Sequence, residues 1–147
     1  MSEITKGKFS KILVAIDDSE PSMDAADYAI SLSQEYNAEI YALHVIHSDV
    51  DLFGPHETSE YMTSMRNKGE KYLDKVRLKA NEKDIQIKTE IISSINMAGG
   101  IVDYAESNNI DLIVIGTTGK SGFKKLLLGS VASSVVAYAH CPVMVVK

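Results

Sequence analysis

The sequence predicts an α/β protein with an open, doubly wound sheet of five parallel strands. Short, continuous apolar runs alternate with amphipathic segments along the chain, which is typical of βα units around a parallel sheet. Right-handed crossovers would place the connecting helices on both faces of that sheet. The predicted strands are residues 11–16, 39–46, 85–92, 111–116 and 142–146.

Four helices are predicted between these strands. Ser19 can cap the first, with Pro21 in its first turn and small or apolar residues along one face. A long helix from Glu57 to about Asn81 follows a surface loop at residues 47–57. The remaining two helices are expected at residues 97–107 and 130–139.

Composition limits the classes of function. A chain of 147 residues with 45% apolar content suits one domain, which we expect to span residues 1–147. The net charge of −5 argues against nucleic-acid binding. No apolar run approaches a membrane span, and Met1–Ser10 is too polar for a signal peptide. The single cysteine, Cys141, fits a reducing cytoplasm and a structural role.

The most informative stretch is a glycine motif between the fourth predicted strand and the last helix. Gly116 ends the strand, Gly119 follows, and Gly129 precedes Ser130 at the start of the helix. Glycines let the backbone approach a phosphate, and the N–H groups of a helix start can bind it. The Walker spacing fails because Val114 stands where its first glycine would be, and no G-x-G-x-x-G is present. The alternative is that these glycines are ordinary turn and cap residues.

Charge supports the phosphate interpretation. No Asp or Glu follows Asp111, whereas Lys120, Lys124, Lys125 and Lys147 all lie in that segment. A locally positive stretch beside a glycine turn favours a polyanionic ligand such as a triphosphate. The same lysines could instead only keep a loop soluble.

The pattern G-x2-G-x9-G-[S/T] resembles the signature of the universal stress protein family. The similarity extends to residues 11–17 with Ser19, to residues 43–45 and to residues 140–146, and so covers nearly the whole chain. It departs from the family at Asp18, where many members have a small residue, and at Thr118, where histidine or arginine is frequent. The resemblance implies an adenine nucleotide alpha hydrolase-like fold with strand order 3-2-1-4-5.

That order implies one ligand crevice built from separate segments. Ligands of open α/β sheets bind beyond the carboxyl ends of strands, where the strand order reverses. Asp17 and Gly116 would flank this crevice, with Val45 beside them. ATP is the ligand that the resemblance implies. Asp17 would then contact base or sugar, although it could instead only cap the first helix. The predicted nucleotide-binding residues are Ala15, Ile16, Asp17, Val45, Ile115, Gly116, Thr118, Gly119, Lys120, Gly129, Ser130 and Val131.

Catalysis has little support in the sequence. No Ser–His–Asp order, paired-carboxylate spacing or H-E-x-x-H motif occurs, and only His44 has a route to the crevice, although a strand histidine is more often simply packed. Magnesium or manganese could be carried on nucleotide phosphates without dedicated protein ligands. The favoured function is an ATP-binding regulatory protein that acts as a nucleotide-dependent switch in stress response, with a protein partner that the sequence does not name. The alternatives are a slow ATP hydrolase and an interaction module that no longer binds nucleotide.

Assembly is predicted from the last strand. Residues 142–146 are uncharged and apolar, and the implied order places them at an exposed sheet edge, which invites pairing with another chain. The resemblance implies a homodimer through this strand, with Val143 and Val145 in the interface. The strand could instead be covered by the loop at 47–57, which would leave a monomer.

Overall fold

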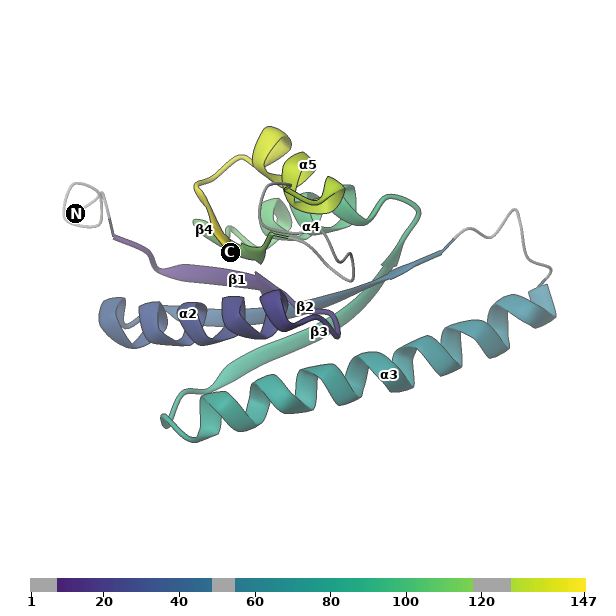
Figure 1. Cartoon of the computed structure of the whole chain (residues 1–147), viewed down its shortest axis with the longest axis horizontal. Coiled ribbons are helices and arrows are strands. Elements are labelled where there is room, and N and C mark those ends of the chain that lie inside the picture. The colour runs from purple at the N-terminus through teal and green to yellow at the C-terminus, as the bar shows by residue number, and fades with distance from the viewer. Residues whose placement is uncertain (1–7, 49–54, 118–127) are drawn as a thin grey trace.

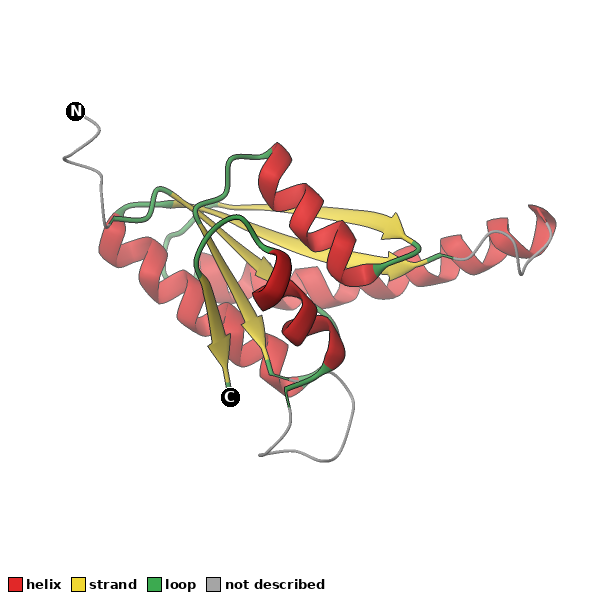
Figure 2. Ribbon diagram, turned by 90° about the horizontal axis from the view of Figure 1, so that it is seen from above, coloured by secondary structure: helices red, strands yellow, loops and turns green. Residues whose placement is uncertain are grey.

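The computed structural model describes residues 8–48, 55–117 and 128–147. Within these residues, parallel strands form one sheet with the order β3-β2-β1-β4-β5, flanked by helices on both faces (Figures 1 and 2). The predicted fold class and strand order are therefore confirmed. The strands are β1 (Lys11–Ala15), β2 (Glu39–His47), β3 (Ile87–Ser94), β4 (Leu112–Gly116) and β5 (Val143–Val146). The helices are α2 (Glu20–Tyr36), α3 (Pro55–Asn81), α4 (Met97–Ser107) and α5 (Ser130–Tyr138).

Two elements, α3 and β3, begin two residues away from their predicted starts. Helix α3 begins at Pro55, so the last part of the predicted loop is helical, as suits proline in a first turn. Strand β3 begins at Ile87 instead of Ile85, because the Ile85 N–H closes the end of α3 by donating to the Ala80 carbonyl at 2.9 Å. Asp84 takes the left-handed conformation that this turn needs, with φ 57°.

The alternation of side chains along the central strands divides the core into two layers. On β1, Ile12 and Val14 belong to the apolar layer that includes α2 and α3, whereas Leu13 belongs to the layer that includes α4 and α5. These three side chains are fully buried, and β4 is equally apolar, as a central strand covered on both faces must be. Strand β3, at the sheet edge, alternates between exposed and half-buried residues.

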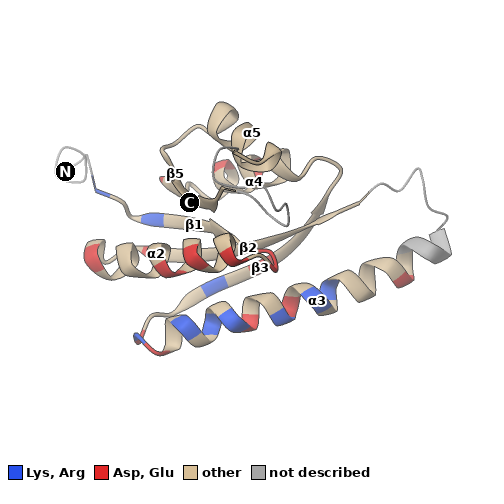
Figure 3. Ribbon diagram, viewed as in Figure 1, with Lys and Arg blue, Asp and Glu red and all other residues tan. Residues whose placement is uncertain are grey.

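Helices α2 and α3 cover one face side by side and carry opposite charges where they meet. Figure 3 shows acidic residues along α2, and lysine and arginine residues interspersed with acidic ones along α3. Asp27 of α2 and Lys79 of α3 form an ion pair at 3.0 Å. The pair is largely exposed, so we attribute the packing of the two helices to their buried apolar faces and not to this contact.

The start of α4 explains one of two adjacent glycines. Asn96 caps the helix by accepting a hydrogen bond from the Gly99 N–H at 2.9 Å. A Cβ at Gly100 would lie 3.0 Å from Cβ of Ser94 at the end of β3. The close approach of α4 to the end of β3 thus favours glycine at position 100. No helix in the described part of the chain is long and apolar enough to cross a bilayer.

Candidate nucleotide site

A cavity of about 240 Å³ lies at the carboxyl ends of β1, β2 and β4, on the face covered by α4 and α5. Strand order reverses between β1 and β4, so the cavity occupies the position where open α/β sheets bind ligands. Its walls come from the strand ends, from the start of α2, from α4 and from the first turn of α5. The lining residues are Ala15, Ile16, Asp17, Ser19, Ser22, Leu43, Val45, Met97, Ile101, Ile115, Gly116, Thr117, Gly129, Ser130, Val131 and Ala132.

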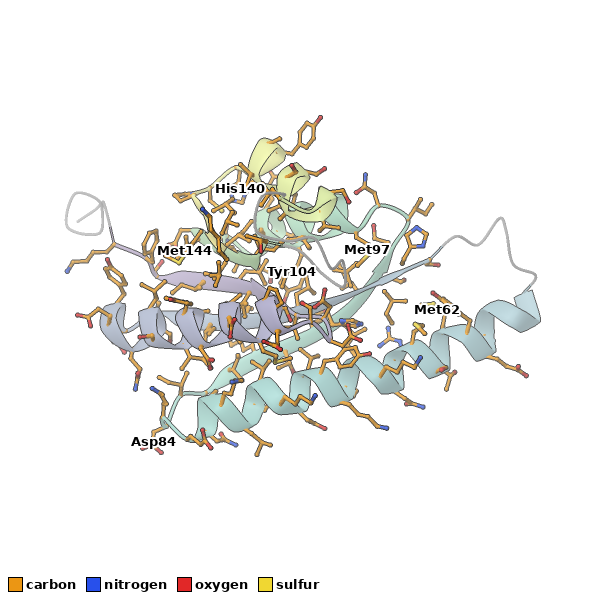
Figure 4. The ribbon with its side chains drawn as sticks, viewed as in Figure 1. Met62, Asp84, Met97, Tyr104, His140 and Met144 are labelled. Atoms are coloured by element: carbon orange, nitrogen blue, oxygen red, sulfur yellow. The ribbon has the colours of Figure 1, made fainter. Side chains whose placement is uncertain are left out.

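All predicted site residues in the described part of the chain line this one cavity. Thr118, Gly119 and Lys120 lie outside the described residues. Sequence reasoning missed Met97 (labelled in Figure 4) and Ile101, which enter from the first turns of α4. No motif marks these residues, because only the packing of α4 brings them to the wall.

The first turn of α5 presents backbone N–H groups at the cavity. Gly129 is the capping residue in an extended conformation, with φ −61° and ψ 159°, and makes no side-chain cap. Its own N–H donates to the Thr117 carbonyl at 2.7 Å, which ties the helix start to the end of β4. Because glycine has no side chain to cover the N–H groups of Ser130 and Val131, this helix start can receive an anion.

Asp17 is built into the start of α2. Its Oδ1 accepts hydrogen bonds from the N–H of Ser19 at 2.8 Å and from the Ser19 hydroxyl at 2.5 Å. Ser19 in turn caps α2 by accepting from the Ser22 N–H at 3.2 Å, and the Asp17 N–H donates to the Ser22 hydroxyl at 3.1 Å. The capping role considered from the sequence is therefore real. It also fixes the carboxylate at the cavity wall, with Oδ1 hydrogen-bonded to Ser19.

Of the two alternatives that the sequence left for His44, packing in the core is the one that the structure shows, and His44 does not line the cavity. The neighbouring Leu43 and Val45 line the cavity, but the His44 ring lies edge-on against Tyr72 of α3, with ring centroids 5.4 Å apart. Successive side chains of a strand point to opposite faces, so β2 directs His44 to the α2–α3 layer.

A second hollow and Cys141 lie apart from the residues that line this cavity. A more open hollow of about 850 Å³ lies at the opposite end of the strands, but its Lys88 is paired with Glu39 at 3.0 Å and its Arg77 donates to Thr89 at 2.6 Å. Burial, and then the charge of Asp111, raises the pKa of the Cys141 thiol, which disfavours a thiolate nucleophile. Among the described residues, no group of three His, Cys, Asp or Glu side chains could hold a metal ion.

Comparison with known proteins decides the family. The sequence model described as "Universal stress protein family" matches residues 8–147. The chain belongs to the universal stress protein family. A universal stress protein of Methanocaldococcus jannaschii is 41% identical over 95% of this chain and 82% of its own length. One from Bacillus subtilis is 36% identical over 95% of this chain and 99% of its own length.

Solved universal stress protein structures share the fold. One from Lactobacillus plantarum superimposes with a TM-score of 0.82 at 29% identity, covering 95% of this chain and 99% of that chain. A structure from Archaeoglobus fulgidus, described as a complex with dAMP, has a TM-score of 0.72 at 18% identity over 95% of this chain and 98% of its own. One from Arabidopsis thaliana, described with AMP bound, has a TM-score of 0.68 at 22% identity over 94% of this chain and 91% of its own. At these last two identities the likeness is one of fold.

Proposed function

We propose that this chain is an ATP-binding regulatory protein of the cytoplasm, a single domain that acts as a nucleotide-dependent switch in stress response. The observation that carries the proposal is the cavity at the reversal of strand order, bounded on one side by the uncapped start of α5. Family membership supports it, as does the description of two family structures as bound to dAMP and AMP. A single cysteine fits the proposed compartment.

The two ends of the cavity suit the two ends of a nucleotide. Leu43, Val45, Met97, Ile101 and Ile115 offer an apolar slot for adenine, a flat and weakly hydrated base. Asp17 lies at the cavity wall, where its carboxylate would accept a hydrogen bond from a ribose hydroxyl.

The phosphate end would be held by backbone groups. The N–H groups of Ser130 and Val131 lie at the positive end of the α5 dipole, which would attract the negatively charged phosphates. Gly116 lines the cavity nearby, and we propose that Gly119 and Lys120 complete this end. Magnesium or manganese would be carried by the phosphates. ATP hydrolysis, if it occurs, would be slow and would reset the switch.

We also propose a homodimer through β5. The Ile113 N–H donates to the Pro142 carbonyl and the Thr117 N–H to the Val146 carbonyl, so even-numbered residues of this strand face β4. In a parallel ladder, the backbone groups of Val143 and Val145 then point to the other side. That edge, which no described strand of the chain covers, offers donors and acceptors to a second copy.

The nucleotide proposal is tested by finding the ligand and measuring its affinity. Mass spectrometry of freshly purified protein should find a released adenine nucleotide. Calorimetry with ATP and magnesium should give a tighter Kd than GTP, because the apolar slot and backbone contacts suit adenine. Absence of heat and of a thermal shift with ATP, AMP and ADP alike would favour the interaction-module alternative.

A further inference from the structure

The end of β1 departs from regular pairing with β2 at the cavity wall. Strand β1 ends at Ala15, which is in register with Leu43, and the Ile16 N–H donates to the Leu43 carbonyl at 2.8 Å. In a parallel ladder the next bond would run from the Val45 N–H to the Ile16 carbonyl. That carbonyl is instead 2.7 Å from Nδ1 of His44.

The protonation of the ring follows from this contact. A carbonyl oxygen only accepts, so Nδ1 must carry the hydrogen and donate it to Ile16. The His44 ring therefore takes the place that the Val45 N–H would hold in a continued ladder. Val45 lines the cavity, so its N–H is released from β1 where a ligand could meet it.

Helix α3 fixes the position of the ring. His44 is only 9% exposed and lies edge-on against Tyr72. The backbone of Gly69 is so close that an added Cβ would lie 2.6 Å from Cδ2 of His44. The glycine at position 69 thus admits the ring between α3 and β2, where the Cβ of any other residue would clash with it.

We propose that His44 is a positioning residue for adenine binding. It draws the Ile16 carbonyl out of the β1–β2 ladder and so keeps the Val45 N–H open to the base. This inference rests on the proposed nucleotide function and deepens it. It also connects α3 to the cavity. Gly69 and Tyr72 of α3 pack against the His44 ring, and the ring binds the Ile16 carbonyl just before Asp17.

Two variants separate the hydrogen bond from the bulk of the ring. His44→Asn keeps a nitrogen donor on Cγ, where Nδ1 is attached, whereas His44→Leu keeps apolar volume and has no donor. We expect AMP to bind His44→Leu about tenfold more weakly than wild type, the equivalent of one hydrogen bond, and His44→Asn within about threefold of wild type. Equal AMP affinity in wild type and a folded His44→Leu variant would overturn the proposal, as would an equal loss in both variants.

The hydrogen on Nδ1 of His44 can be tested in the protein without nucleotide. Long-range nitrogen–proton NMR correlations of the wild-type protein should show a hydrogen on Nδ1 of His44. A ring protonated on Nε2 alone would contradict the inferred role. If the Nδ1 form is found but wild type binds no adenine nucleotide, the function proposed above fails and so does the role of His44 in binding, while the geometry at Ile16 stands. If wild type binds AMP and His44→Leu binds equally well, only the role of His44 fails.

Discussion

Gly116 at the end of β4 lies directly against Pro21 in the first turn of α2. A Cβ added at Gly116 would stand 2.7 Å from the carbonyl carbon of Pro21 and 2.8 Å from its Cβ. Such distances are too short for a side chain, and the obstacle is backbone that cannot rotate away. Glycine at this position is therefore required by the packing of α2 on the sheet, in addition to any role beside a phosphate.

Gly116→Ala should therefore destabilise the protein without any ligand present. We expect a loss of about 1–3 kcal/mol in the free energy of unfolding, as for other overpacked sites. Gly99→Ala is the matched control, because its Cβ would meet nothing closer than 3.4 Å and alanine favours a helix by about 0.5–1 kcal/mol. Urea denaturation measures both variants. An unchanged midpoint for Gly116→Ala would show that α2 shifts freely at Pro21.

Ser130→Asp should separate stability from binding. Ser130 is exposed and begins α5, so a carboxylate there should interact favourably with the helix dipole and stabilise the folded protein by about 0.3–1 kcal/mol. The same charge should repel nucleotide phosphates and weaken ATP binding at least tenfold, by charge repulsion in a confined site. Thermal unfolding and calorimetry measure the two effects.

Ser133→Asp is the control for that change. It adds the same charge one turn along α5 at an exposed position that does not line the cavity. We expect ATP affinity to change by less than about threefold. If the two aspartates weaken binding equally, the phosphates do not sit at the start of α5.

Tyr104 should titrate above the ordinary range for tyrosine. Burial, and then the charge of Glu90, raises the pKa of the Tyr104 phenol to about 12, and its hydroxyl donates to Glu90 at 3.1 Å. The folded pKa exceeds the unfolded value of about 10, so this contribution to stability is complete below about pH 10 and is lost as the pH rises toward 12.

The Tyr104 titration can be isolated by difference. Tyrosinate absorbance of wild type minus that of Tyr104→Phe should show the late transition. In Glu90→Gln the transition should move to lower pH yet stay above the unfolded value, because burial is the larger cause. A Tyr104 transition at the ordinary pKa would mean that the α4–β3 contact opens before the phenol ionises.

The β5 edge is tested by Val145→Pro. Proline removes the N–H of Val145, which faces away from β4, and would block pairing with a second chain. We expect a dimer for wild type and a monomer for the variant in light scattering at micromolar concentration. Leu78→Asp, an exposed apolar residue on α3, should leave the dimer intact. A monomeric wild type would refute the interface.

The local sequence pattern determined the helices and strands of this protein. Apolar runs of strand length, the Ser19 cap and the Pro21 first turn specified the elements, because each depends on residues a few positions apart. Family resemblance added the strand order. Together they predicted residues from four segments that the structure brings to one cavity, although nucleotide binding there remains a prediction.

Only the tertiary structure decided the roles that depend on contacts between distant segments. The side of β2 on which His44 lies follows from strand alternation, but its bond to Ile16 requires β1 to leave the ladder while α3 holds the ring. The fit of Gly116 against Pro21 likewise joins residues far apart in sequence. Such contacts depend on how the layers pack in three dimensions. In a close-packed interior, the residues next to a position in the sequence do not specify which distant backbone it will contact.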